Sequence, residues 1–158
     1  MAIQFSPENL ERFEVGAGHD DYGGRKMAWD LTAGDVLPAA YTLKLGAGLS
    51  IGGIVVDETE QPVSDAKLNS YRFWSGDDDS PNKAGNQADF HTKSISTDAM
   101  GHWRLRGIPK ELLDNIGFSV SHPDFVGTNF NLLNSPNDEA KFLDGTHKIV
   151  LRRGLVIK

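Results

Sequence analysis

An acidic run from Asp77 to Asp79 is the densest group of oxygen ligands in the sequence. Calcium binds several carboxylate and carbonyl oxygens, so Asp77, Asp79 and the nearby Asn82 form a candidate calcium site. A typical calcium-binding loop, however, has regularly spaced acidic residues and a distal glutamate, and this run has neither. The sequence therefore favours a solvated charge run over a metal site, and no cofactor is expected.

The chain also has five histidines, a residue type that serves as metal ligand or general base in many enzymes. They are His19, His91, His102, His122 and His147. No two of them are spaced as His-x-His or His-x-x-x-His, so the sequence predicts no histidine metal site. A serine nucleophile on a sharp strand-to-helix turn is not expected either. We therefore expect that the chain is not an enzyme.

Three aromatic residues, Tyr71, Phe73 and Trp74, stand together before a polar, turn-rich segment at 76–89, which we predict to be a loop. Successive side chains of a strand point to opposite faces, so at least one ring is expected to face outward. An exposed ring beside the acidic run could stack on a sugar or contact a protein. The alternative is that all three rings belong to the core or cover an edge. The candidate ligand-binding residues are Trp74, Asp77, Asp78 and Asp79.

Composition and charge exclude several classes of protein. The chain has 158 residues, which suits one ordinary domain, and a net charge of −6, which disfavours nucleic acid as a partner. No cysteine is present, so disulfides and thiolate metal sites are excluded. No apolar run approaches the ~18 residues that a membrane-spanning helix needs, so no membrane insertion is expected. No signal peptide is visible.

The distribution of glycine and proline predicts short strands rather than long helices. The 17 glycines and 7 prolines leave few stretches as long as a typical helix, and apolar residues mostly alternate with polar ones. Short helical turns are predicted near 7–12 and 109–114, where a proline stands at a first helical position. A second loop is predicted at 135–139. Together these patterns predict an all-β sandwich or barrel.

Two parts of the chain resemble each other. The segment His19–Tyr22 aligns with His122–Phe125, and the stretch at 41–51 aligns with that at 147–157 at nearly the same offset. Residues 1–47 are therefore interpreted as the C-terminal part of a preceding repeat, or as extra strands that dock on the module. Residues 48–153 form one complete module, and 154–158 begin a following repeat or linker. His19 and His122 are expected to share a structural role, such as a turn hydrogen bond.

Three segments of the module carry family-like motifs: 53–57 with 61–66, 97–105, and 120–125. They are similar to the first strand and return, the central hairpin, and the His-Pro-x-aromatic strand of one family. The module thus resembles the carboxypeptidase regulatory-like domain, a transthyretin-like (prealbumin-like) β-sandwich. The usual glycine of the first turn is Glu60 here, so the type of that turn is left open.

The resemblance implies an all-β, approximately seven-stranded, antiparallel Greek-key sandwich with a carbohydrate-binding-like fold. Iron-dependent intradiol dioxygenases have a related sandwich, but the closely spaced histidine pair that they use is missing, so we exclude this class. The residues expected to hold the turns and the core of the sandwich are Asp57, Pro62, Asp98, Gly101, Trp103, His122 and Phe125.

The resemblance also implies a function, that of a non-catalytic accessory module in a larger, exported protein at an extracellular, periplasmic or cell-surface location. The module would be a structural spacer or a binding surface; the alternative is a carbohydrate-binding or calcium-stabilised adhesion module. Its expected partners are neighbouring modules of the same chain and a saccharide or protein ligand. A third of a sandwich leaves strand edges open, so 1–47 is expected to dock on the module or to exchange strands in a homodimer.

Overall fold

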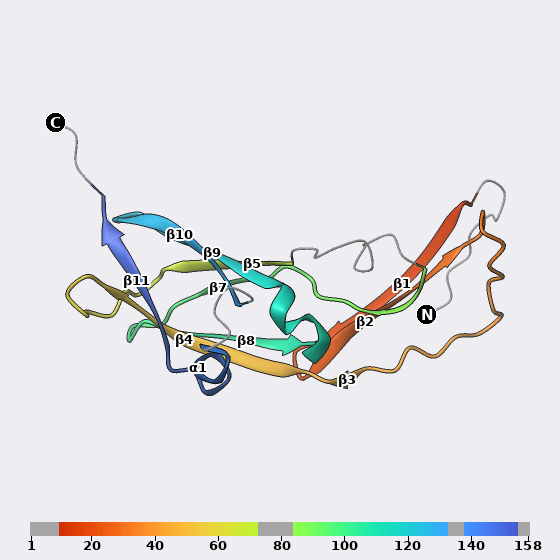
Figure 1. Cartoon of the computed structure of the whole chain (residues 1–158), viewed down its shortest axis with the longest axis horizontal. Helices are drawn as coiled ribbons and strands as arrows, with labels where there is room; N and C mark the ends of the chain where they lie inside the picture. Colours follow the sequence, from red (N-terminus) through yellow and green to blue (C-terminus); the bar gives the residue numbers. More distant parts are fainter. Residues whose placement is uncertain (1–9, 73–83, 133–137, 155–158) are drawn as a thin grey trace.

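The computed structural model describes residues 10–72, 84–132 and 138–154. In these ranges the chain consists mostly of β-strands, which confirms the all-β class (Figure 1). The described strands are β1 (Arg12–His19), β2 (Tyr22–Asp30), β3 (Gly46–Ala47), β4 (Leu49–Asp57), β5 (Lys67–Arg72), β6 (Gly85–Ala88), β7 (Ser94–Ser96), β8 (His102–Ile108), β9 (Ile116–His122), β10 (Phe125–Asn131) and β11 (His147–Arg153). The helical segments are η2 (Lys110–Asn115), a 3₁₀ helix, and α1 (Glu139–Asp144).

Seven of the described strands form one sheet, in the order β7-β5-β9-β10-β11-β4-β8. In Figure 1, β5, β9 and β10 lie above β4 and β8, and β11 crosses from one group to the other. The sheet therefore folds over on itself and encloses a core. The strands β1, β2, β3 and β6 form a second sheet, and the β1–β2 hairpin extends away from the module.

One pair of strands departs from the predicted antiparallel pattern. β11 runs parallel to β4, with His147 opposite Gly53 and Ile149 opposite Val55. The alternation of buried residues along β11 fits a parallel neighbour as well as an antiparallel one, so the sequence pattern did not distinguish them. The prediction of a purely antiparallel arrangement is therefore wrong for this pair. The predicted number of about seven strands describes the larger sheet and omits the second one.

The core lies between the two halves of the folded sheet. Burial alternates along β8, which points Trp103 and Leu105 inward, and Phe118 and Val120 of β9 are buried in the same cluster. The ring centroids of Trp103 and Phe118 are 5.1 Å apart. Burying one large apolar side chain contributes about 1.5–3 kcal/mol, so this cluster is a main source of stability.

The turn after β4 is organised by one carboxylate. Asp57 Oδ1 accepts hydrogen bonds from the Thr59 hydroxyl at 2.7 Å, the Thr59 N–H at 2.8 Å and the Gln61 N–H at 3.0 Å. These bonds, that of the Thr59 hydroxyl foremost, lower the pKa of the Asp57 carboxyl. Glu60 has a φ of 64°, a conformation that glycine adopts easily, and Pro62 then forms an isolated bridge to the end of β4. Glu60 thus has the backbone conformation expected of the glycine that it replaces.

The turn between β7 and β8 is built in the same way. Asp98 Oδ1 accepts hydrogen bonds from the N–H groups of His102 and Met100, both at 2.9 Å, and these bonds lower the pKa of that carboxyl. Gly101 has a φ of 75°. A Cβ atom at Gly101 would lie only 2.4 Å from the Val55 carbonyl oxygen, so this turn requires glycine.

The two predicted helical turns have different outcomes. The turn near 109–114 is confirmed by η2, whose Leu112 and Leu113 are buried. The prediction of a helical turn near 7–12 is wrong for its described part, because β1 begins at Arg12 and pairs with β2. Residues 7–9 lie outside the described residues. In the described ranges, no helix is both long and apolar enough to span a membrane.

Helix α1 was not predicted, and a loop was expected at 135–139. The described part of the chain has a helix from Glu139, which ends at Gly145 in the left-handed conformation, φ 82°. Six residues are too few for an apolar period to stand out in a sequence, and too few for a helix that is stable alone. The helix is stabilised by packing, because Phe142 is completely buried and stacks on Phe130 at 5.7 Å between centroids.

His147 packs against this helix. Its ring stacks on Phe142 with 3.8 Å between centroids and 19° between planes. Burial lowers the pKa of the imidazole, the Asp138 carboxylate acts in the opposite direction, and Lys141 lowers it further. The Nδ1 atom is buried and has no hydrogen-bond partner among the described residues. The folded state therefore favours the neutral imidazole.

We predict that stability falls as the pH falls below about 6.5, and that His147→Phe removes this dependence. A histidine with a lower pKa in the folded state binds fewer protons there, so acid stabilises the unfolded chain. The substitution also removes a buried, unsatisfied nitrogen and should raise stability at pH 7 by about 1 kcal/mol. Thermal unfolding between about pH 8 and pH 5 measures both effects. An unchanged slope in His147→Phe would contradict the assignment.

Gly101→Ala should lower the free energy of unfolding by at least about 2 kcal/mol. The reason is a positive φ combined with backbone contact at the Val55 carbonyl oxygen. Gly46→Ala is the matched control, because a Cβ there meets nothing within 4 Å. Urea denaturation of the three proteins gives the comparison, and equal losses in both variants would refute the steric explanation.

Candidate functional site

The β1–β2 hairpin is joined to the module by main-chain pairing. β2 pairs with β1 on one side, and on the other side with β6, where Arg25 lies opposite Ala88 and Ala28 opposite Gly85. β2 also pairs with β3 through Tyr22. We call the contact between this hairpin and residues 84–93 and 106–111 the seam. The division of the chain at residue 47 stays a prediction, as do the repeat and the role of 154–158.

Glycines allow the two backbones to meet at the seam. A Cβ atom on Gly24 would lie 2.5 Å from the Asp89 carbonyl oxygen. Gly107 has a φ of 79°, and a Cβ there would lie 2.6 Å from the His19 carbonyl oxygen. A Cβ on Gly48 would likewise lie 2.8 Å from the carbonyl carbon of Tyr22 on the hairpin. The hairpin can dock at this depth only because these positions carry no side chain.

Opposite charges also face each other across the seam. The Lys93 Nζ lies 2.7 Å from the Asp20 Oδ1, and the hydrogen bond from this ammonium lowers the pKa of the Asp20 carboxyl. Ion pairs between exposed side chains contribute little to stability, so the pairs orient the hairpin more than they bind it. The pairs are Lys93 with Asp20, Arg106 with Asp21, and Arg25 with Glu111.

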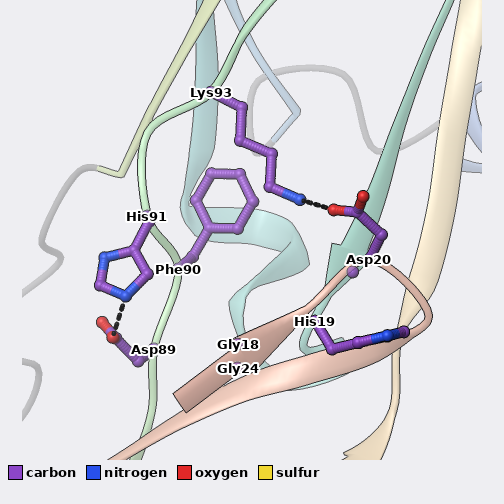
Figure 2. A pocket seen from close by; sticks show the side chains of 9 residues that line it. Gly18, His19, Asp20, Gly24, Asp89, Phe90, His91 and Lys93 are labelled. Atoms are coloured by element: carbon purple, nitrogen blue, oxygen red, sulfur yellow. Dashed lines mark hydrogen bonds and ion pairs between the residues drawn. The ribbon is translucent and has the colours of Figure 1, made fainter. Parts of the chain in front are cut away.

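A cavity of about 230 Å³ lies within the seam (Figure 2). Figure 2 shows the Lys93 side chain extending to Asp20, while His91 turns to Asp89 on the opposite side. The apolar part of the wall comes from Phe90 and from glycines of the hairpin. The lining residues are Gly18, His19, Asp20, Gly24, Asp89, Phe90, His91, Lys93 and Gly107.

The polar groups of this cavity already have partners. Besides its pair with Asp20, Lys93 Nζ donates a hydrogen bond to the Arg106 carbonyl oxygen at 3.1 Å. His91 Nε2 lies 3.4 Å from Asp89 Oδ2, an ion pair when the imidazole is protonated. His19 Nδ1 accepts a hydrogen bond from a backbone N–H in its own turn. The interactions around this cavity therefore hold the hairpin and the segment 89–93 together.

The two hairpin tips with histidine have the same local construction. His19 and His122 each accept, at Nδ1, a hydrogen bond of 3.1 Å from the backbone N–H two residues later. Each ring packs on the aromatic residue three positions on: Tyr22, with 5.3 Å between centroids, and Phe125, with 5.2 Å. Both histidines thus have a structural role in a turn.

The ligand-contact and calcium predictions fall on a part of the chain that is not described. Trp74, Asp77, Asp78, Asp79 and Asn82 lie outside the described residues, as does Phe73, so these predictions stay predictions. Tyr71, which precedes them on β5, donates a hydrogen bond from its hydroxyl to Asn131 Oδ1 at 2.9 Å. Within 10–72, 84–132 and 138–154, no three His, Cys, Asp or Glu residues come together as a possible metal site.

Asp89, His91 and Lys93 were not predicted to belong to one site. They stand at every second position, with the buried Phe90 between the first two. This alternation is the signal that could have placed them on one side of an extended segment. Asp20, the hairpin partner of Lys93, is distant in sequence, and no local pattern indicates that contact.

The sequence pattern Gly-x-Ser-x-Gly, which was not noted above, occurs at 48–52 with Ser50 at its centre. In hydrolases such a serine stands on a sharp turn between a strand and a helix. Here β4 continues through the pattern as a strand, and Ser50 Oγ is buried without a partner in the described part of the chain. The backbone at this serine is therefore not that of a nucleophile elbow.

Comparison with known proteins finds similarity in structure alone. No protein-family model matches the sequence, and no curated protein matches it. Among solved structures, the chain is similar to 3-chlorocatechol 1,2-dioxygenase from Rhodococcus opacus 1CP, with 17% identity and a TM-score of 0.43. The match covers 69% of this chain and 60% of the dioxygenase chain.

This comparison corrects one expectation. The chain was expected not to be an enzyme, and the structural neighbour is an enzyme, which contradicts that expectation. We therefore withdraw the description of the chain as non-catalytic. A likeness at this identity and TM-score carries no argument about a reaction, substrate or metal in the present chain, so no catalytic residue is assigned from it.

Gly24→Ala should loosen the hairpin from the module. The new methyl group would meet the Asp89 carbonyl oxygen at 2.5 Å, so the β2–β6 ladder must shift, at a cost of roughly 1–3 kcal/mol. Amide hydrogen exchange should accelerate along β2 while β9 stays protected. Gly16→Ala is the matched control on β1, because its Cβ would meet Asp89 Oδ2 at an ordinary 3.6 Å. Unchanged exchange in Gly24→Ala would show that the close contact is unimportant.

Proposed function

We propose that this chain is an accessory module of a larger, exported protein, with a transthyretin-like sandwich at its centre, which acts as a rigid spacer and binding surface. The observation that carries the proposal is the seam. The hairpin is held by a strand ladder, by glycine contacts and by paired charges, so that the hairpin and the module form one stiff body. Stiffness along the long axis is the property that a spacer needs.

The shape of the molecule supports the same proposal. In Figure 1 the hairpin and the folded sheet lie end to end, and β11, the last described strand, is at the opposite end from the hairpin. Neighbouring modules of the same chain would then be held apart by the length of this body. An extracellular, periplasmic or cell-surface location belongs to this proposal.

The experiment measures whether the hairpin moves with the module. Backbone ¹⁵N relaxation should give equal order parameters for β2 and β9, roughly 0.85 for both. Sedimentation velocity should give a monomer of 17.3 kDa with a raised frictional ratio. Markedly lower order parameters in β2 would refute the spacer proposal, and a dimer would favour strand exchange between two chains.

The alternative is a carbohydrate-binding or calcium-stabilised adhesion module. Its predicted ligand residues, Trp74 with the acidic run, lie outside the described residues. A calcium-stabilised module should lose thermal stability when calcium is chelated with EDTA, and a spacer should not. Asp79→Asn should abolish such an effect of calcium, whereas Asp124→Asn, in an exposed turn, should leave it intact.

A further inference from the structure

One buried donor in the core lacks an acceptor. Trp103 is only 4% exposed, and its indole Nε1 has no hydrogen-bond partner among the described residues. A buried N–H without an acceptor is unfavourable, so such a group calls for an explanation. Gly53 packs closely beside this nitrogen, since a Cβ there would lie 3.0 Å from Nε1 and 2.4 Å from the His147 carbonyl oxygen.

Trp103 lines a second cavity, of about 430 Å³. This cavity lies at the start of β8, whereas the seam cavity includes Gly107 near the end of that strand. Its wall comes from segments far apart in sequence: Gly53 of β4, the turn at 96–98, β8, and the end of α1 at Asp144. The fold thus places charged and polar residues from distant segments in one cavity with Trp103.

The two carboxylates of this cavity have free bonding capacity, whereas the Thr97 hydroxyl is already bonded to the Ala66 N–H and the Val63 carbonyl oxygen. Asp98 and Asp144 both use Oδ1 for the hydrogen bonds of their own turns. Within the described ranges, Oδ2 of each carboxylate is left to accept a donor. Arg104 is exposed beside them and brings a guanidinium with five donors. The seam cavity differs, because its charged groups are paired with one another.

The balance of these groups selects the chemistry of a ligand. Even when His102, 3.7 Å from Asp98, is protonated, the two carboxylates and one guanidinium give no excess positive charge, so an anion gains little here. The carboxylates need donors, while the indole and the guanidinium need acceptors. A hydroxyl group is both donor and acceptor, so neighbouring hydroxyls on one neutral molecule match the whole set.

We propose that the cavity formed by Trp103, Arg104, Asp98 and Asp144 is a binding site for a neutral polyhydroxylated ligand, of the size of a single sugar ring. The indole N–H and the guanidinium donate to ligand oxygens, and the free oxygens of the two carboxylates accept from ligand hydroxyls. The site adds a ligand to the binding-surface role and does not depend on the spacer role.

The test follows the indole N–H of Trp103 by NMR during titration with three probes that share the pyranose ring: glucose, glucuronate and glucosamine. Glucose should shift this resonance saturably, while the Trp29 indole stays unchanged as an internal control. Glucuronate should bind at least ~10-fold more weakly, because the two carboxylates repel it. No saturable shift with glucose, or equal binding of glucuronate, would overturn the proposal. A stronger shift with glucosamine would overturn the neutral class in favour of a cation.

Two variants complete the test. Arg104→Gln should raise the dissociation constant for glucose at least ~5-fold and leave the melting temperature unchanged, since this side chain is exposed. Arg152→Gln, also exposed and on β11, is the matched control and should bind as the original chain does. Trp103→Phe keeps the ring and removes the N–H, so calorimetry should show weaker binding. Original affinity in Arg104→Gln would overturn the site even if Trp103→Phe does not fold. Failure of glucose to bind leaves the relaxation test of the spacer intact.

Discussion

The arrangement of the molecule depends on one constraint, the contact of main chain with main chain at the seam. Where Gly24 meets the Asp89 carbonyl and Gly107 meets the His19 carbonyl, no side chain separates the two backbones. This proximity lets β2 pair with β6 and brings Lys93 within reach of Asp20. The ion pairs and the cavity in the seam are consequences of that approach, since neither would form if the hairpin lay a side chain further away.

The sequence predicted correctly those features that depend on residues close together in the chain. The turns at Asp57 and Asp98 follow from a carboxylate that accepts nearby N–H groups, and alternation along β8 identifies Trp103 as a core residue. The 3₁₀ segment after Pro109 was also visible from its proline. These features need only neighbouring residues, and for this reason a single sequence predicts them.

Features that join distant segments were not predictable in the same way. Strand orientation was missed for β11, because buried Ile149 and Leu151 would alternate equally well beside a parallel or an antiparallel neighbour. Helix α1 was missed because it exists through the burial of Phe142 rather than through its own sequence. The seam site was missed because it joins residues 89–93 to the distant hairpin, where Lys93 pairs with Asp20.

The parallel pairing of β4 with β11 has a consequence for how the chain folds. β4 lies near the start of the predicted module and β11 near its end, so their pairing closes a loop that spans nearly the whole module. Closing such a long loop is entropically expensive and slow. During synthesis, Val55 and its neighbours on β4 can form this ladder only after β11 has left the ribosome. Until then one flank of β4 stays unpaired, and an unpaired strand edge is prone to aggregation.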